Sequence, residues 1–125
     1  MAATIEKLLE ALAARAGQRP LPPAFTGVVR VDAEDAGRTE QWYLTLRKGA
    51  VTVAREGEEP DCVVRGDAAT LAAVLEGRAN MMAAVLRGAL EVEGRAILMV
   101  VFQRLTPGEA ADADAPVAGY ARRQS

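Results

Sequence analysis

The residues that most often carry out catalysis are scarce in this chain of 125 residues. It contains no histidine and a single cysteine, Cys62, and its only lysines are Lys7 and Lys48. This composition excludes histidine-based triads, histidine metal sites, zinc fingers and an intramolecular disulfide. A cysteine nucleophile needs a nearby base, so without histidine Cys62 is best interpreted as a small buried apolar residue. We therefore predict no catalytic residue, no metal site and no cofactor, and we expect that the protein is not an enzyme.

Two segments share features with functional loops but lack their defining residues. The acidic stretch 56–61 does not have the spacing of a calcium loop, so it is interpreted as a solvated turn. The segment 88–94 begins and ends with glycine, yet no Lys-Ser or Lys-Thr pair follows it, which excludes a phosphate-binding loop. A carboxylate mechanism would need an acid that points into an apolar cavity, and the alternation of the predicted strands places none there.

Charge and hydropathy exclude two further classes of partner. Fifteen basic residues against seventeen acidic ones leave no excess cation for a nucleic-acid backbone, and only five aromatic rings are available for stacking on bases. The longest apolar run, 96–102, is far shorter than the roughly 20 residues that span a membrane. Glu6 and Lys7 stand where a signal peptide would be continuously apolar, and the C-terminus has no peroxisomal signal. We expect a soluble cytoplasmic protein that does not bind nucleic acid.

The first half of the chain predicts one helix followed by four strands. Apolar residues recur at helical spacing from Thr4 to Ala16, with Thr4 as N-cap and Gly17 as the end of the helix. Its polar face mixes both charges, which favours docking against the domain over lying on a membrane. Four alternating runs then predict half-buried antiparallel strands, and their short connections favour hairpins over parallel crossovers. These runs are 25–32, 41–47, 50–54 and 61–65.

From Gly66 onward the apolar period changes to that of short helices. Asp67 and Asn80 are predicted N-caps of two helices that end at Gly77 and Gly88. Residues 90–93 alternate again as a fifth strand. Periodicity leaves 95–105 open between helix and strand, and its β-branched content leans toward strand. We expect residues 1–108 to form the domain and 109–125 to form a mobile tail rich in alanine and acidic residues.

The order of these elements and glycines is similar to that of the sterol carrier protein type two family of lipid-binding domains. The resemblance covers roughly residues 4–106. The matching segments are the acid-preceded strand 60–67, the helix end at 75–78, the Gly-x-Leu-x-Val-x-Gly strand at 88–94 and the final run ending at 102–105. Two positions depart from the family: Ala89 replaces a residue that is often basic, and Arg95 replaces an Asp or Asn that would cap the last helix.

The resemblance implies an α/β (α+β) fold, in which about four to five helices cover one face of a five-stranded, mostly antiparallel sheet. An apolar tunnel lies between the two layers, and 95–105 is a helix. Apolar residues of the helices and of the second strand are then the candidate lipid-binding residues. Flexible methionine suits such a wall, but the same residues equally suit an ordinary core, and the sequence leaves that division open. The candidates are Leu71, Leu75, Met81, Met82, Val85, Leu86, Ile97, Leu98, Val101, Phe102, Leu105, Trp42 and Leu44.

The function implied by the resemblance is the binding, and intracellular transfer, of a fatty acid, a fatty acyl chain, a sterol or a similar lipid. Burial of about ten methylenes is worth on the order of 8 kcal/mol before ordering costs, which corresponds to roughly micromolar affinity. Transient membrane contact is compatible with this interpretation. The alternative is a non-catalytic accessory or dimerisation module with a closed tunnel, and both a monomer and a homodimer remain open.

Overall fold

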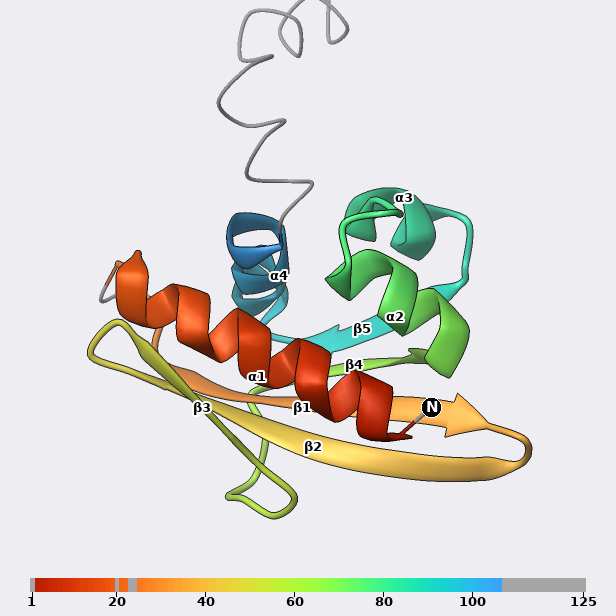
Figure 1. Cartoon of the computed structure of the whole chain (residues 1–125), viewed down its shortest axis with the longest axis horizontal. Helices are drawn as coiled ribbons and strands as arrows, with labels where there is room; N and C mark the ends of the chain where they lie inside the picture. The colour runs from red at the N-terminus through yellow and green to blue at the C-terminus, as the bar shows by residue number, and fades with distance from the viewer. Residues whose placement is uncertain (1, 20, 23–24, 107–125) are drawn as a thin grey trace, which may run out of the picture.

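The computed structural model describes residues 2–19, 21–22 and 25–106 (Figure 1); the predicted tail at 109–125 lies outside this range. Five strands and five helical segments follow one another along the chain. They are α1 (Ala2–Gln18), β1 (Gly27–Asp35), β2 (Arg38–Arg47), β3 (Ala50–Ala54), β4 (Cys62–Asp67), α2 (Ala68–Leu75), α3 (Met81–Leu86), β5 (Leu90–Gly94), the 3₁₀ helix η1 (Ala96–Met99) and α4 (Val100–Leu105). None of the helices within the described ranges combines the length and the apolarity needed to cross a bilayer.

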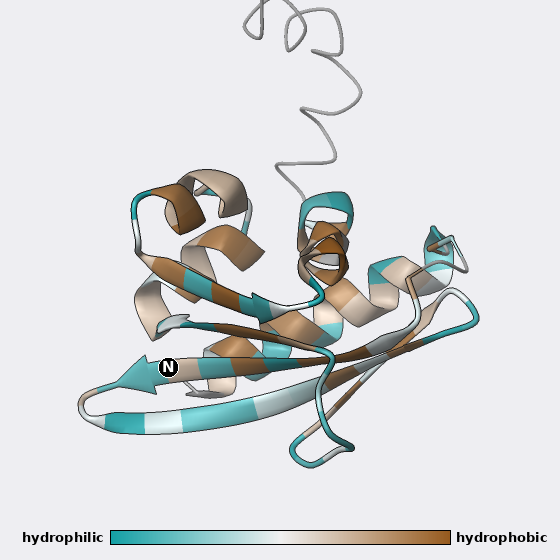
Figure 2. Ribbon diagram, turned by 180° about the vertical axis from the view of Figure 1, so that it is seen from behind, coloured by the Kyte–Doolittle hydropathy of each residue, from teal (hydrophilic) through white to brown (hydrophobic). Residues whose placement is uncertain are grey.

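The strands form one sheet in the order β3-β2-β1-β4-β5, and the helices cover one of its faces (Figures 1 and 2). Three of the four neighbouring pairs are antiparallel, which confirms the expected fold class. The fourth pair, β1 with β4, is parallel, so the expectation of hairpins only was wrong at this point. The reason is the longer connection after β3. It passes the face away from the helices, where Gly57 packs against the ring of Tyr43, and delivers β4 to the far side of β1.

Local sequence signals set most of the boundaries of the elements. The side chain of Asp67 accepts a hydrogen bond from Thr70 N at 3.1 Å, and that of Asn80 accepts one from Ala83 N at 2.9 Å, so both predicted N-caps are confirmed. Helix α1 extends beyond its predicted ends, with Thr4 and Gly17 inside it. A glycine within a helix costs only about 1 kcal/mol relative to alanine, which the buried apolar stripe of α1 offsets.

The last apolar run, 95–105, is helical in spite of its β-branched residues. It forms the single 3₁₀ turn η1 and then α4, with Leu98, Met99 and Phe102 buried. The helical period places these side chains on one side, toward the sheet, so tertiary burial overrides the weak local preference for strand. Arg95, at the N-cap position of η1, makes no capping hydrogen bond through its side chain among the described residues.

We predict that Gly94→Ala destabilises the fold more than Gly37→Ala. Both glycines have a positive φ, +89° and +79°, so each alanine has a cost of about 1–2 kcal/mol for left-handed backbone. A Cβ at Gly94 would also lie 2.3 Å from the carbonyl oxygen of Asp61, which accepts a hydrogen bond from Arg95 N at 2.7 Å. At Gly37 no described atom lies within 4 Å of that position. Urea titration should therefore give the lower free energy of unfolding for Gly94→Ala, and equal losses would contradict the prediction.

Candidate functional site

Apolar side chains gather between the helices and the sheet. Strands contribute every second residue to this core, and the helices contribute their inward stripes (Figure 2). Eight of the thirteen candidate residues lie here, each at most 3% exposed, and all belong to one continuous core. The structure thus brings together candidates from β2, α2, α3, η1 and α4: Trp42, Leu44, Leu71, Leu75, Met81, Leu98, Phe102 and Leu105.

The remaining candidates are not in this buried set. Leu86, Ile97 and Met82 are 80%, 55% and 41% exposed, and they lie on the surface of α3 and η1. Val85 is half-buried against the core. Val101 lies outside the residues whose side chains the structure describes. The candidates therefore form a buried group and a surface group, and the two groups meet on the same short helices.

Three helices on the β4–β5 side of the sheet, α3, η1 and α4, are short. α3 and α4 have six residues each and η1 has four, and neither η1 nor α4 has a capping side chain among the described residues. Helices of this length are at most marginally stable without tertiary packing. Arginines secure their edges: Arg15 Nη1 donates to Leu105 O at 2.7 Å, and Arg95 Nη1 donates to Thr26 O at 3.0 Å. The stability of these short helices therefore depends on the packing of their apolar faces.

A pocket of about 200 Å³ opens at the other end of the layer interface, where the β1–β2 hairpin meets the starts of α1 and α2. Its floor is apolar and its rim is charged. Trp42 is the only one of the described candidate residues that lines it; the other lining residues were not predicted because they meet only when α1, β1, β2 and α2 pack together. The lining residues are Ile5, Ala33, Asp35, Arg38, Glu40, Trp42 and Ala68.

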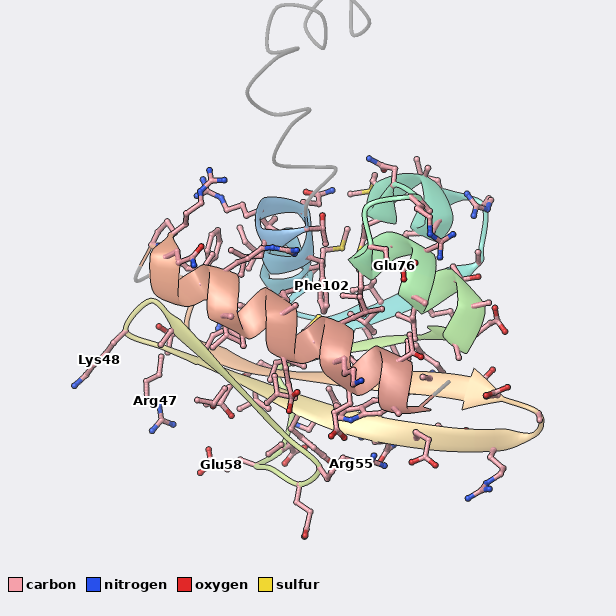
Figure 3. The ribbon with its side chains drawn as sticks, viewed as in Figure 1. Arg47, Lys48, Arg55, Glu58, Glu76 and Phe102 are labelled. Carbon is pink, nitrogen blue, oxygen red and sulfur yellow. The ribbon has the colours of Figure 1, made fainter. Side chains whose placement is uncertain are left out.

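Charged groups fix Trp42 at this pocket. The indole Nε1 donates to Glu6 Oε1 at 3.1 Å, and the guanidinium of Arg55 lies 4.6 Å from the centre of the ring. Arg55 extends from the end of β3 (Figure 3) and also pairs with Glu40. That hydrogen bond is the main reason that the pKa of Glu40 lies below its ordinary value, and the charge of Arg38 adds to the effect. The ring is thus held against the core while its polar edge stays paired.

Among the described residues, Asp32 is the one buried carboxylate, and it lies on the face of the sheet away from the helices. Asp32 is 3% exposed, and its neighbours Val31 and Ala33 point to the helices, so its own side chain points away from them. Arg30 binds it through Nε at 2.8 Å and Nη2 at 3.0 Å, and this pairing raises the pKa of Arg30. Arg65 approaches Asp32 at 3.5 Å. The arginines balance the charge of this carboxylate, and its side chain does not face the interface between the helices and the sheet.

Cys62 is confirmed as a buried residue, 1% exposed. Burial, and secondarily the charge of Asp61, raise the pKa of its thiol above the ordinary value. Among the described residues, no cluster of three or more acidic or cysteine side chains is arranged to hold a metal ion.

The raised pKa of Cys62 predicts both slow labelling and a loss of stability in alkali. The folded protein keeps the thiol proton to higher pH than the unfolded chain, so this contribution to stability is complete below the ordinary thiol pKa of about 8.5 and is lost as the pH rises above it. A thiol reagent should react slowly with the native protein and rapidly in urea. The alkaline fall in the free energy of unfolding should be smaller in Cys62→Ala, and an unchanged fall would contradict the assignment.

Comparison with known proteins identifies relatives of this arrangement. The family model described as the SCP-2 sterol transfer family matches residues 5–107. The crystal structure of sterol carrier protein 2 like 2 from Aedes aegypti is 24% identical, covers 78% of this chain and 92% of its own, and superimposes with a TM-score of 0.62. The palmitated form of that protein in solution is 23% identical, with coverages of 77% and 92% and a TM-score of 0.59.

The same fold occurs inside a much larger enzyme. The sec-alkylsulfatase Pisa1 from Pseudomonas sp. is 20% identical over 76% of this chain but only 15% of its own, with a TM-score of 0.60. No curated protein matches the chain. At these identities the solved structures show that the fold is shared.

Proposed function

Because this chain belongs to the SCP-2 sterol transfer family, we propose that it binds the hydrophobic part of a lipid between its helices and its sheet and carries that lipid between membranes or enzymes. Membership of this family supports a function in lipid binding and transfer in general. The observation that carries the proposal for this chain is the apolar interface itself, in which candidate residues from five elements meet. We propose a fatty acid, a fatty acyl chain or a sterol as the ligand, and a role in the cytoplasm.

The ligand site that we propose opens when a lipid binds. The pocket at Trp42, about 200 Å³, is smaller than the roughly 300–1,000 Å³ of typical ligand pockets, so a long chain needs more space than the pocket offers. The short helices α3, η1 and α4 are the part of the layer most easily moved away from the sheet. Their movement would let an alkyl chain replace contacts that Leu98 and Phe102 now make with the core.

Burial of the alkyl chain provides the binding energy without any catalytic group. Each methylene removed from water is worth about 0.8 kcal/mol, and the displaced side chains and the ordering of the ligand reduce this gain. Among the described residues, no buried side-chain nitrogen or oxygen lacks a hydrogen-bond partner, so the apolar interface carries no orphan polar group. We propose a non-catalytic carrier on these grounds.

A second candidate function is an accessory or dimerisation module whose interface stays closed. The burial of eight candidate residues favours it, since each is at most 3% exposed and all belong to one continuous core. The likeness to a segment of a larger enzyme also fits such a module, because there the fold is one part of a longer chain.

Native mass spectrometry of the gently purified protein separates the two functions. A carrier should show an added lipid mass that denaturing conditions remove, and the stripped protein should take up a fluorescent fatty acid that unlabelled palmitate displaces. Competition by a sterol then shows which class of lipid is preferred. A bare protein mass together with no uptake would contradict the carrier function and favour the accessory module.

A further inference from the structure

The three exposed large apolar side chains of the described structure flank one strand. Met82 and Leu86 lie on α3, just before β5, and Ile97 lies on η1, just after it. Helices α3 and α4 rise on the same side of the sheet at the two ends of β5 (Figure 1). Leu86 is 80% exposed and Ile97 is 55% exposed, so water contacts large apolar areas at both points. Side chains of this size on one side of a domain often mark an interaction site.

The two segments that carry these side chains contain basic residues but no acidic ones. Arg87 follows Leu86 directly, and Arg95 precedes Ile97 by two positions. The segments 77–90 and 94–106 contain no aspartate or glutamate, although the whole chain has a formal net charge of −2. Within the described residues neither Arg87 nor Arg95 forms an ion pair with a carboxylate: Arg95 donates to a backbone carbonyl instead.

The acidic residues of β5 do not cancel this charge. Leu90 points into the core, so Glu91 and Glu93 alternate to the face of the sheet away from the helices. Both carboxylates lie near the guanidinium of Arg65, at 3.4 and 3.5 Å. The helix side of β5 therefore combines exposed apolar side chains with two arginines that form no ion pair among the described residues.

We infer that the surface formed by Met82, Leu86, Arg87, Arg95 and Ile97, here called the β5-flank surface, docks onto the headgroup region of an anionic lipid bilayer. Apolar side chains insert among the headgroups while the arginines attract the negative surface. A few side chains give weak and reversible attachment, which suits a protein that must leave the membrane again. This inference deepens the proposed function, because it places α3 and η1, the helices that would move, against the source of the lipid.

Flotation with lipid vesicles tests the β5-flank surface with the full chain. The wild type should bind vesicles of phosphatidylcholine mixed with phosphatidylglycerol, should bind pure phosphatidylcholine much less, and should be released by salt. Arg87→Glu should weaken binding to the anionic vesicles at least fivefold, since each basic residue near such a surface contributes roughly one factor of five. Leu86→Ser and Ile97→Ser should each weaken binding as well. Circular dichroism checks that each variant is folded, as expected for exposed positions.

Arg47→Glu is the matched control for charge. Arg47 is exposed on β2 and points away from the helical layer (Figure 3), and its substitution changes the net charge by the same amount as Arg87→Glu. It should bind anionic vesicles like the wild type. Equal losses in the two variants would assign the effect to net charge and overturn the inference. A wild type that does not bind vesicles would also overturn it. So would a wild type that forms a dimer and does not bind vesicles, if Leu86→Ser dissociates that dimer.

Uptake of a fluorescent fatty acid from solution separates this inference from the proposed function. A wild type that takes up the fatty acid but does not bind vesicles contradicts the membrane docking of the β5-flank surface and leaves the carrier function standing. A wild type that binds anionic vesicles but takes up no fatty acid overturns the carrier function, and the docking surface stands. Arg87→Glu should lose vesicle binding and keep uptake from solution.

Discussion

Replacing Met81 by aspartate is expected to unfold the domain, whereas the same substitution at the adjacent Met82 is expected to leave it folded. Met81 is 1% exposed and belongs to the core between the helices and the sheet. A carboxylate at that position would be buried without a partner, which costs several kcal/mol of a total stability of about 5–15 kcal/mol. Met82 is 41% exposed, and surface substitutions usually change stability by about 0.5 kcal/mol or less. Circular dichroism and urea titration measure both outcomes.

Met81→Leu is the control for this pair, because it keeps an apolar side chain of similar volume. It should cost less than about 1.5 kcal/mol and preserve the cooperative urea transition. Met82→Asp should also take up less fluorescent fatty acid, since Met82 lies on α3, one of the helices that we propose to move. A folded Met81→Asp would show that α3 does not seal the core, and an unfolded Met82→Asp would show that its side chain carries more of the packing than its exposure indicates.

This contrast between neighbours marks the limit of sequence-based prediction in short helices. The apolar stripe of α1 runs through four turns, so the period alone identifies Ile5, Leu9 and Leu12 as its buried side, and the structure confirms it. In α3 only six residues are helical, and all of them are apolar or alanine. No period can be measured over less than two turns, so the buried Met81 and the exposed Leu86 were equally good candidates.

Local signals predicted the helices and strands better than they predicted which strands pair. Asp67 and Asn80 act within three residues of their own position, so their capping roles can be predicted without knowledge of the rest of the fold. The two-residue turn at 48–49, with positive φ at both positions, was likewise predicted. The first hairpin is tighter than expected: β1 and β2 run beyond the predicted ends at 32 and 41, so only residues 36–37 connect them. The parallel pairing of β1 with β4 depends on where a longer loop delivers the chain, which no local pattern specifies.

Burial of polar residues was also beyond local prediction. Asp32 stands at an outward position of a strand, where a solvated carboxylate is the natural expectation. Its burial depends on Arg30 two residues away and on Arg65 from another strand, which the parallel pairing of β1 and β4 brings beside it. The pocket at Trp42 has the same origin, because Ile5, Ala33 and Ala68 meet only after α1, β1 and α2 are packed.

The helical form of 95–105 was predictable from the family resemblance but not from propensity. Its valines and isoleucine favour strands by only a fraction of a kcal/mol each, whereas burying Leu98, Met99 and Phe102 is worth several kcal/mol together. In the folded chain η1 packs against β4 and β5, and α4 packs against α1. The free energy of burial therefore decides the conformation, and it can be evaluated only in the folded chain.

Phe102→Ala is expected to lower the stability of the free protein strongly and to make it more responsive to lipid. Phe102 is 2% exposed on α4, and truncation of a buried phenylalanine costs about 3–5 kcal/mol through lost burial and the cavity that remains. At about 4–8 °C per kcal/mol for a domain of this size, the Tm should fall by roughly 12 °C or more. The ring is also one of the groups that a lipid would have to displace, so its removal lowers the cost of ligand binding.

The Tm of Phe102→Ala should therefore rise more on addition of palmitate than the Tm of the wild type, because a ligand that binds only the folded state stabilises it by about 2.7 kcal/mol at a hundred times its Kd. Leu46→Ala is the matched cavity variant: Leu46 is 1% exposed on β2 but is not among the proposed lipid contacts. It should lose stability and respond to palmitate like the wild type. Scanning calorimetry with and without palmitate measures all three shifts, and an equal response of the two cavity variants would identify Phe102 as ordinary core.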